Sequence, residues 1–178
     1  MKHRALGTTG IAVSEIGFGA WGIGGRTAGA TSYGDTDDEL SLAALGNALD
    51  AGITFFDTSP AYGSGHSEAL IGRAFAGARR DRVVIATKAG YTDWTQPPDF
   101  APGAIRRSLE ASLRRLGTDR VDVLQLHNPA PALFATGVLA AALDGLVAEG
   151  KARCWGVSVK APEEVATSIR LSRPRSVR

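Results

Sequence analysis

The sequence predicts a parallel α/β fold, because short apolar runs alternate with helical segments at a steady interval. Five runs of strand length and five helical segments follow a short N-terminal β-hairpin, expected between His3 and Glu15. The repeat is roughly 30 residues long, which is the size of a right-handed βαβ unit with parallel strands. No linker, tandem repeat or low-complexity block interrupts the series, so residues 1–178 are predicted to form a single domain.

Each predicted strand is a short apolar run bounded by turn or helix signals, which is typical of buried strands. The five strands are predicted at Ile16–Gly19, Ile53–Asp57, Val83–Lys88, Val121–Leu126 and Cys154–Val159.

The helices are predicted from apolar residues at helical spacing, with start and stop signals on either side. The segment 36–39 (Thr-Asp-Asp-Glu) has the form of a capping box, and Leu40, Ala43, Ala44 and Ala48 follow as an apolar face. The other helices are predicted at Glu68–Phe75, from Pro102 to a stop at Gly117, from Leu139 to Gly150, and from Pro162 onward.

Two architectures satisfy this alternation: an open doubly wound sheet and a closed (β/α)₈ barrel of the TIM type. A doubly wound dinucleotide-binding sheet is expected to carry G-x-G-x-x-G after its first strand. Gly22 and Gly24 lie near that point, but Thr27 stands where the third glycine belongs, and no helix follows directly. The barrel is therefore the predicted architecture.

Composition excludes several classes of protein. The formal net charge of +2 is too small to indicate a nucleic-acid partner, and no apolar run approaches the roughly 18 residues that span a bilayer. The N-terminal Met-Lys-His-Arg leads into Gly7 and Thr8, not into the apolar core of a signal peptide. A single cysteine, Cys154, excludes an intramolecular disulfide and fits a reducing compartment. We expect a cytoplasmic protein.

Polar residues gather where three successive strands end, which is where parallel α/β proteins carry out their chemistry. Asp57 ends the second strand and is followed by Tyr62, Lys88 ends the third, and His127 follows the fourth. Such a set supports proton donation to a carbonyl group. A tyrosine hydroxyl has a reference pKa of about 10, a nearby ammonium favours its phenolate, and a carboxylate keeps that ammonium charged. A histidine can bind the carbonyl oxygen or share the proton.

Taken singly, each residue also has a structural interpretation: Asp57 as a turn cap, Tyr62 as a surface turn residue, His127 as a loop hydrogen-bond partner. Lys88 is harder to explain in this way, because an ammonium at the end of an apolar strand is costly without a partner. Four such residues at three neighbouring strand ends favour a catalytic site. A rival interpretation is a lysine-dependent aldolase in which Lys88 forms a Schiff base.

The segments around these residues resemble the aldo-keto reductase family. The similarity runs from about Leu6 to about Ile169, with the motifs in family order. The matching segments are 56–68 around the aspartate and tyrosine, Ala86–Gly90 around the lysine, Leu124–Pro129 around the histidine, and Trp155–Ser158 on the fifth strand.

This resemblance implies reduction of an aldehyde or ketone with NADP(H), without a metal, and with Tyr62 as general acid assisted by Asp57, Lys88 and His127. It also implies that Trp21, Asp57 and Ser158 lie at the cofactor. Three further residues lie on loops at the same end and either shape the substrate pocket together with Trp21 or only support these loops. They are Tyr91, Trp94 and Asn128.

Two departures from the family pattern matter. Val159 stands where the family usually has an asparagine that contacts the nicotinamide. In addition, about five of the eight βα units are present, because a (β/α)₈ barrel needs about 250 residues. The sequence is thus expected to be the N-terminal part of a barrel. It is either a truncated product of an ordinary reductase or a part that self-association or a second chain completes. The alternative is a truncated, non-catalytic fragment that acts as a binding or interaction module.

Overall fold

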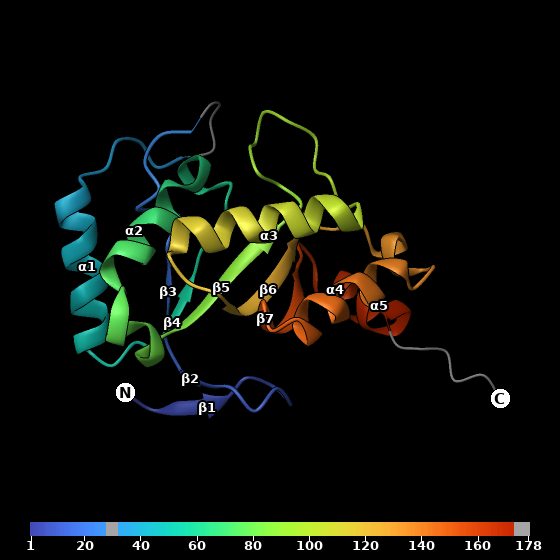
Figure 1. The fold of residues 1–178 in the computed structure, drawn as a ribbon, viewed down its shortest axis with the longest axis horizontal. Helices are drawn as coiled ribbons and strands as arrows, with labels where there is room; N and C mark the ends of the chain where they lie inside the picture. The colour runs from blue at the N-terminus through green and yellow to red at the C-terminus, as the bar shows by residue number, and fades with distance from the viewer. Residues whose placement is uncertain (28–31, 173–178) are drawn as a thin grey trace.

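The computed structural model describes residues 1–27 and 32–172 (Figure 1). Strands β1 (His3–Ala5) and β2 (Ala12–Ser14) pair antiparallel, with Arg4 opposite Val13, so the predicted N-terminal hairpin is confirmed. In Figure 1 this hairpin lies below the main sheet, on the side where the parallel strands begin.

The main sheet has five parallel strands whose order in space is their order along the chain. A doubly wound sheet would reverse its strand order at a switch point, whereas consecutive order is the arrangement of a (β/α) barrel. The fold is therefore a partial TIM-type barrel, as predicted. The strands are β3 (Gly17–Gly19), β4 (Phe55–Asp57), β5 (Val84–Ala89), β6 (Val121–His127) and β7 (Ala152–Ser158).

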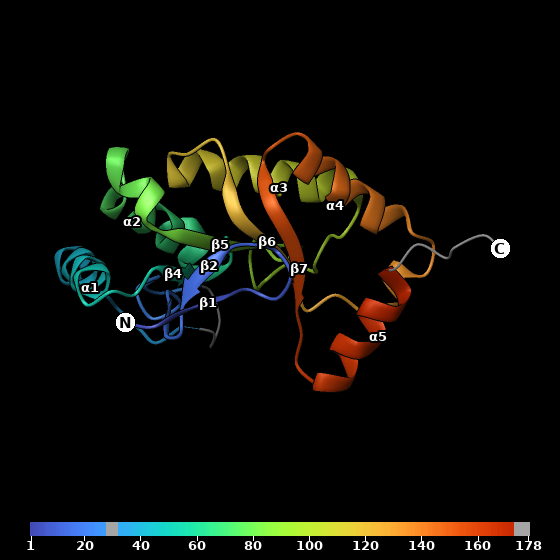
Figure 2. The same cartoon turned by 90° about the horizontal axis from the view of Figure 1, so that it is seen from below.

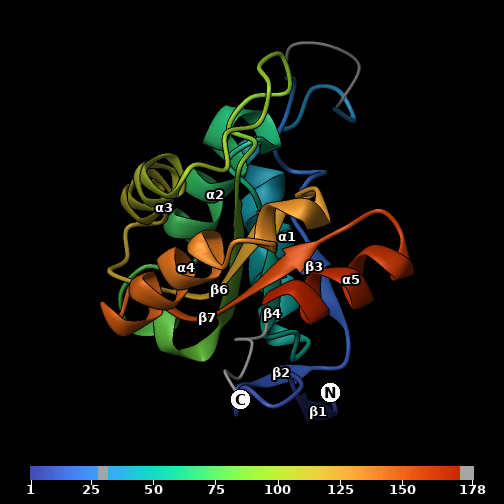
Figure 3. The same ribbon diagram turned by 90° about the vertical axis from the view of Figure 1, so that its right-hand side faces the viewer.

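Helices follow the strands, and the first four line up along one side of the sheet, while α5 lies beyond β7 (Figure 2). Figure 3 views the sheet from the β7 edge, with α2, α3 and α4 on one side and α5 on the other. The helices are α1 (Asp38–Asp50), α2 (His66–Ala74), α3 (Pro102–Leu116), α4 (Val138–Ala148) and α5 (Pro162–Ser172), with 3₁₀ turns η1 (Tyr62–Gly65), η2 (Gly77–Arg82) and η3 (Pro131–Phe134). Among the described residues, no helix is both long and apolar enough to cross a membrane.

The two faces of the sheet carry different cores. Side chains that alternate along the strands toward the helices, such as Phe56, Ile85 and Leu124, are fully or almost fully buried and form the main core. On the other face, Ile11 and Val13 of the hairpin pack against Val84 in a second, smaller core. The hairpin therefore covers the inner face near the start of the strands and leaves the carboxyl end of that face uncovered.

Helix α1 departs from the sequence prediction at its start and in its buried face. The N-cap is Asp37, whose side chain accepts a hydrogen bond from the backbone nitrogen of Leu40 at 2.9 Å, so the cap lies one residue beyond Thr36. This start turns Leu40 into solvent, where it is 73% exposed, and buries Leu45 and Leu49 instead. Leu45 and Leu49 enter the core in place of the predicted Ala43 and Ala44, because a leucine side chain buries more apolar area than an alanine does.

Candidate active site at the carboxyl ends of the strands

The strand register brings the predicted site residues to one face of the sheet. Asp57 lies beside Ala86, Lys88 lies beside Gln125, and His127 lies beside Ser158. Neighbours in register point to the same face, as do residues two apart along a strand. The side chains of Asp57, Lys88, Gln125 and His127 therefore share the inner face, at the end that the hairpin leaves uncovered.

Lys88 is the centre of the polar cluster. Its side chain is only 4% exposed, and its Nζ atom donates to Asp57 Oδ1 at 2.5 Å, to the carbonyl oxygen of Thr58 at 2.9 Å and to Tyr62 Oη at 3.1 Å. All three ammonium hydrogens thus have an acceptor, which offsets the cost of burying the charge. The geometry places a positive charge in hydrogen-bond contact with the tyrosine oxygen.

Tyr62 is followed by a turn in which Gly63, Ser64 and Gly65 all have positive φ. Gly63 and Gly65 have φ of 61° and 95°, in the left-handed region that glycine tolerates best. A Cβ atom on Gly63 would lie 1.8 Å from the carbonyl oxygen of Gly24, so the turn packs directly on the loop after β3. This packing fixes the approach of Tyr62 to Lys88.

The buried carboxylate of Glu68 helps to hold the same turn in place. Glu68, at the start of α2, is fully buried and accepts from Thr87 Oγ1 at 2.5 Å and from Arg115 Nε at 2.6 Å. The Arg115 side chain lies against Gly65, where a Cβ atom would come within 2.6 Å of it. The pair Glu68–Arg115 therefore holds the Tyr62 turn and the strand of Lys88 together.

His127 is 6% exposed, and burial together with the charges of Lys88 and Lys160 lowers its pKa from 6.5 to about 4. Its imidazole is therefore neutral at pH 7. Its Nδ1 atom lies 3.4 Å from the hydroxyl of Ser59, which also accepts from the backbone nitrogen of Ala61 at 3.2 Å. The ring thus keeps its other nitrogen, Nε2, for a further partner.

Aromatic rings surround Tyr62 and His127. Trp21 stacks on Tyr62 with ring centroids 6.0 Å apart, and Tyr91 and Trp94 lie edge-on to His127 at 5.6 Å and 5.1 Å. Three of the four expected pocket residues therefore meet at the cluster. Asn128 differs: its backbone has φ of 53° and its nitrogen donates to the carbonyl oxygen of Ser158 at 2.7 Å, which joins the ends of β6 and β7.

A cavity of about 370 Å³ lies on the inner face between the hairpin and this cluster. Asp57, Gln125 and Gly156 line it toward the cluster, and Leu6 and Thr9 line it toward the hairpin. A Cβ atom on Gly156 would meet nothing within 4 Å, so this part of β7 leaves room for a flat ring. Ser158 stands at the end of the same strand, next to His127 in register. Asp57 and Gly156 are therefore the residues of this cavity that could meet a coenzyme, while Ser158 lies outside its lining. In the described parts of the chain no group of three or more His, Cys, Asp or Glu side chains could hold a metal ion.

Sequence reasoning missed three supporting residues: Gln125, Ser59 and Glu68. Gln125 donates to Asp57 Oδ2 at 2.8 Å, so both oxygens of that carboxylate are held. A signal was present, because Gln125 is a polar residue in an apolar strand, two positions before His127 and hence on the same face. Ser59 and Glu68 gave no comparable signal, since their partners come from distant segments.

Comparison with known proteins gives a consistent result. A family model described as the aldo/keto reductase family matches residues 15–173. The aldo-keto reductase YhdN of Bacillus subtilis is 39% identical over 94% of this chain and 50% of its own length. The NADH-specific methylglyoxal reductase of Escherichia coli is 34% identical over 89% of this chain and 52% of its own length. This chain therefore spans about half the length of these curated relatives.

Solved structures show the same fold. The holo form of an aldo-keto reductase from Bacillus halodurans superposes with a TM-score of 0.82 at 30% identity, covering 97% of this chain and 55% of that one.

Proposed function

The chain belongs to the aldo/keto reductase family, and from this premise we propose that its polar cluster reduces an aldehyde or ketone to an alcohol, with NADPH as coenzyme and Tyr62 as general acid. The contact between Tyr62 Oη and Lys88 Nζ at 3.1 Å carries the proposal. A tyrosine held only for packing would not need a buried ammonium at its oxygen.

In the proposed reaction, the Tyr62 hydroxyl gives its proton to the substrate oxygen as negative charge develops there. The Lys88 ammonium stabilises the charge that remains on the tyrosine oxygen, and it does so strongly because it is almost fully buried. Asp57, at 2.5 Å from Lys88, pairs with the ammonium and directs it at Tyr62. The three residues thus form a chain in which only Tyr62 meets the substrate.

His127 is proposed to orient the carbonyl group. The Ser59 oxygen accepts from Ala61, so its own hydrogen is free to donate to His127 Nδ1. We propose that this direction holds, so that the ring hydrogen sits on Nε2, which then donates to the substrate oxygen as a neutral group. The low pKa of about 4 supports this role, since a neutral imidazole positions a carbonyl without competing with Tyr62 as the acid.

The nicotinamide of the coenzyme is proposed to lie at the end of the cavity that Asp57 and Gly156 line, with further contacts from Trp21 and Ser158, which stand outside the cavity lining. The bound coenzyme would supply the hydride for the carbonyl carbon. Val159 does not provide an amide contact at the position after Ser158. Trp21, Tyr91 and Trp94 are proposed to line the substrate pocket. The single cysteine supports a reducing, cytoplasmic setting for the reaction.

The test is a titration of NADPH, and in parallel NADH, into the 178-residue chain, followed by protein fluorescence and by coenzyme consumption with a panel of aldehydes and ketones. Micromolar binding with turnover, and a preference for NADPH, is the expected result. Turnover with NADH alone would show that NADH, not NADPH, is the coenzyme, as it is in the name of the Escherichia coli relative. Absence of both binding and turnover would favour the alternative, a non-catalytic binding module.

A further inference from the structure

A second cavity lies at the opposite end of the sheet from the candidate active site. Its volume is about 300 Å³, and it is open to solvent between the hairpin on one side and the segments that begin β5, β6 and β7 on the other. Its charged lining consists of Arg80, Arg82, Arg120, Arg153, Asp81 and Asp122. Four guanidinium groups against two carboxylates give the cavity a formal charge of +2, and His3 adds a further basic group.

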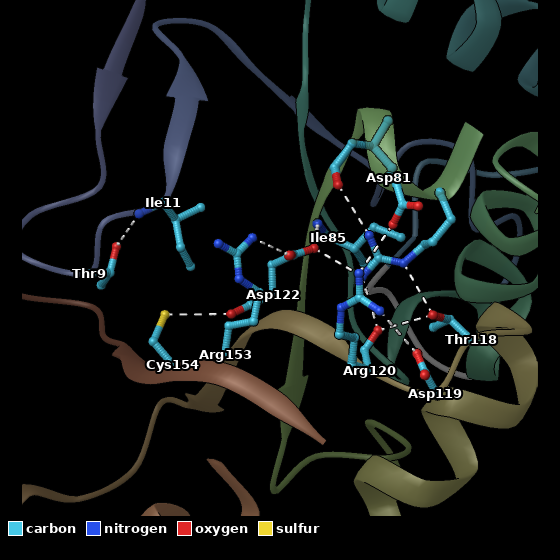
Figure 4. A network of polar contacts seen from close by, with 12 residues as sticks. Thr9, Ile11, Asp81, Ile85, Thr118, Asp119, Arg120, Asp122, Arg153 and Cys154 are labelled. Carbon is cyan, nitrogen blue, oxygen red and sulfur yellow. Dashed lines mark hydrogen bonds and ion pairs between the residues drawn. The ribbon is translucent and has the colours of Figure 1, made fainter. Parts of the chain in front are cut away.

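One buried carboxylate is shared by two of these arginines. Asp122 is 3% exposed and accepts from Arg80 Nη2 at 3.0 Å, from Arg153 Nη1 at 2.9 Å and from the backbone nitrogen of Ile85 at 2.9 Å. Figure 4 shows its carboxylate between Arg153 and the start of β5, with Arg120 close by. A single negative charge that serves two guanidiniums leaves a positive charge uncompensated at the cavity wall.

Arg80 uses most of its donors in contacts within the fold. Besides Asp122 it donates to the carbonyl oxygens of Val83 at 3.1 Å and Arg120 at 2.9 Å, and to Thr118 Oγ1 at 3.2 Å. Its side chain is 13% exposed. Arg80 and Asp122 therefore form the rigid floor of the cavity, and the groups that could meet a ligand are the other arginines.

Those other arginines have donors to spare. Within residues 1–27 and 32–172, the Arg82 side chain makes no hydrogen bond or ion pair, and the residue is exposed. Arg153 is 47% exposed and uses one nitrogen for Asp122, while Arg120 pairs with Asp81 and Asp119, both of which are more than three-quarters exposed. Exposed ion pairs of this kind are weak and exchange readily.

We propose that this cavity binds a small phosphate-bearing anion. Guanidinium groups from three separate segments line it, and a tetrahedral phosphate accepts hydrogen bonds from several directions, whereas a single carboxylate accepts in one plane. The volume is at the small end of ligand sites, which suits a compact phosphorylated molecule. The site is independent of the proposed reductase activity, because it lies at the starts of β5 and β6 and the polar cluster lies at their ends.

The proposal is tested by calorimetric titration of inorganic pyrophosphate into the wild-type chain at low ionic strength, where screening of exposed charges is least. Arg82→Gln and Arg153→Gln are each expected to weaken binding about tenfold or more, since each removes a charge-assisted contact. Arg82→Gln breaks no internal bond, so its effect is separable from any loss of folding in Arg153→Gln. Arg114→Gln, on the exposed face of α3, removes the same charge elsewhere and should leave affinity unchanged.

Three results would overturn the site. Pyrophosphate could fail to bind the wild type. Arg114→Gln could weaken binding as much as Arg82→Gln does, which would mean that binding depends on the net charge of the chain and not on this cavity. Succinate, a dicarboxylate, could bind as tightly as pyrophosphate, which would exclude recognition of phosphate. None of these measurements depends on turnover, so they stand whether or not the chain reduces carbonyl compounds.

Discussion

The side-chain amide of Gln125 donates to Oδ2 of Asp57 at 2.8 Å, while Lys88 holds Oδ1 of the same carboxylate at 2.5 Å. Gln125 and Lys88 are direct neighbours across β5 and β6. The carboxylate is thereby fixed at both oxygens, and Gln125 does this without adding a charge. We therefore infer that Gln125 positions Lys88 and, through it, Tyr62.

This relationship predicts a graded response at position 125. Gln125→Leu removes one hydrogen bond, worth about 1 kcal/mol, and should lower kcat about five- to tenfold. Gln125→Glu places a second carboxylate against Asp57, and the repulsion of like charges should cost more, about a hundredfold. Steady-state kinetics of the two variants provide the measurement. Gln96→Leu, in an exposed loop, is the matched control and should leave kcat unchanged. Wild-type rates in Gln125→Glu would refute the positioning role.

Removal of the Tyr62 hydroxyl tests the proposed acid directly. Tyr62→Phe should lower the reduction rate at least about a hundredfold while leaving NADPH affinity nearly unchanged, because the ring still stacks on Trp21. Tyr33→Phe deletes a hydroxyl from an exposed ring beside Trp21 and controls for the loss of a phenol as such. Near-normal turnover in Tyr62→Phe would remove Tyr62 from the mechanism.

Ser59 is predicted to set the tautomer of His127. Ser59 is fully buried, and without its hydroxyl the ring is free to carry its hydrogen on Nδ1, so that Nε2 no longer donates to the substrate. Ser59→Ala should lower kcat about tenfold with little change in coenzyme affinity. Nitrogen NMR of the His127 ring reads the tautomer itself: the Nε2–H form is expected in the wild type. The same form in Ser59→Ala, with full activity, would show that Ser59 plays no part.

Much of this arrangement follows from local sequence. The strand runs 53–57 and 83–88 end at polar residues, and His127 directly follows the run 121–126. Parallel topology then requires Asp57, Lys88 and His127 to meet at one end. The consecutive strand order likewise agrees with the predicted barrel. These features are predictable because strand alternation and right-handed crossovers leave few ways to assemble them.

What sequence could not supply were contacts that depend on tertiary packing. The cap of α1 moved from Thr36 to Asp37, and Leu40 turned outward, because Leu45 and Leu49 compete better for the core. The contact of Arg115 with Glu68 joins residues 47 positions apart and depends on how α3 packs on α2. No periodicity in either segment encodes such a pairing.

The buried imidazole of His127 predicts a loss of stability in acid. Its pKa is about 4 in the folded chain and about 6.5 when unfolded, so between these values the unfolded state binds more protons. The free energy of unfolding should therefore fall as pH drops from about 6.5 to 4, by up to about 3 kcal/mol. Urea unfolding at several pH values measures this. In His127→Gln the fall should be smaller by that amount, and an identical pH dependence would contradict the assignment.

The turn that carries Tyr62 should be sensitive to a single methyl group at Gly65. Gly65→Ala both strains a residue with φ of 95° and drives Arg115 away from the fully buried Glu68, so unfolding free energy should fall by about 2–4 kcal/mol. Gly77→Ala is the matched control: φ is 63°, but nothing lies within 4 Å of the new methyl, so only the strain of about 1 kcal/mol is expected. Equal losses in the two variants would mean that Arg115 shifts at no cost. If Gly65→Ala also slows reduction at temperatures where it stays folded, and Gly77→Ala does not, then the Glu68–Arg115 pair acts on Tyr62 through this turn.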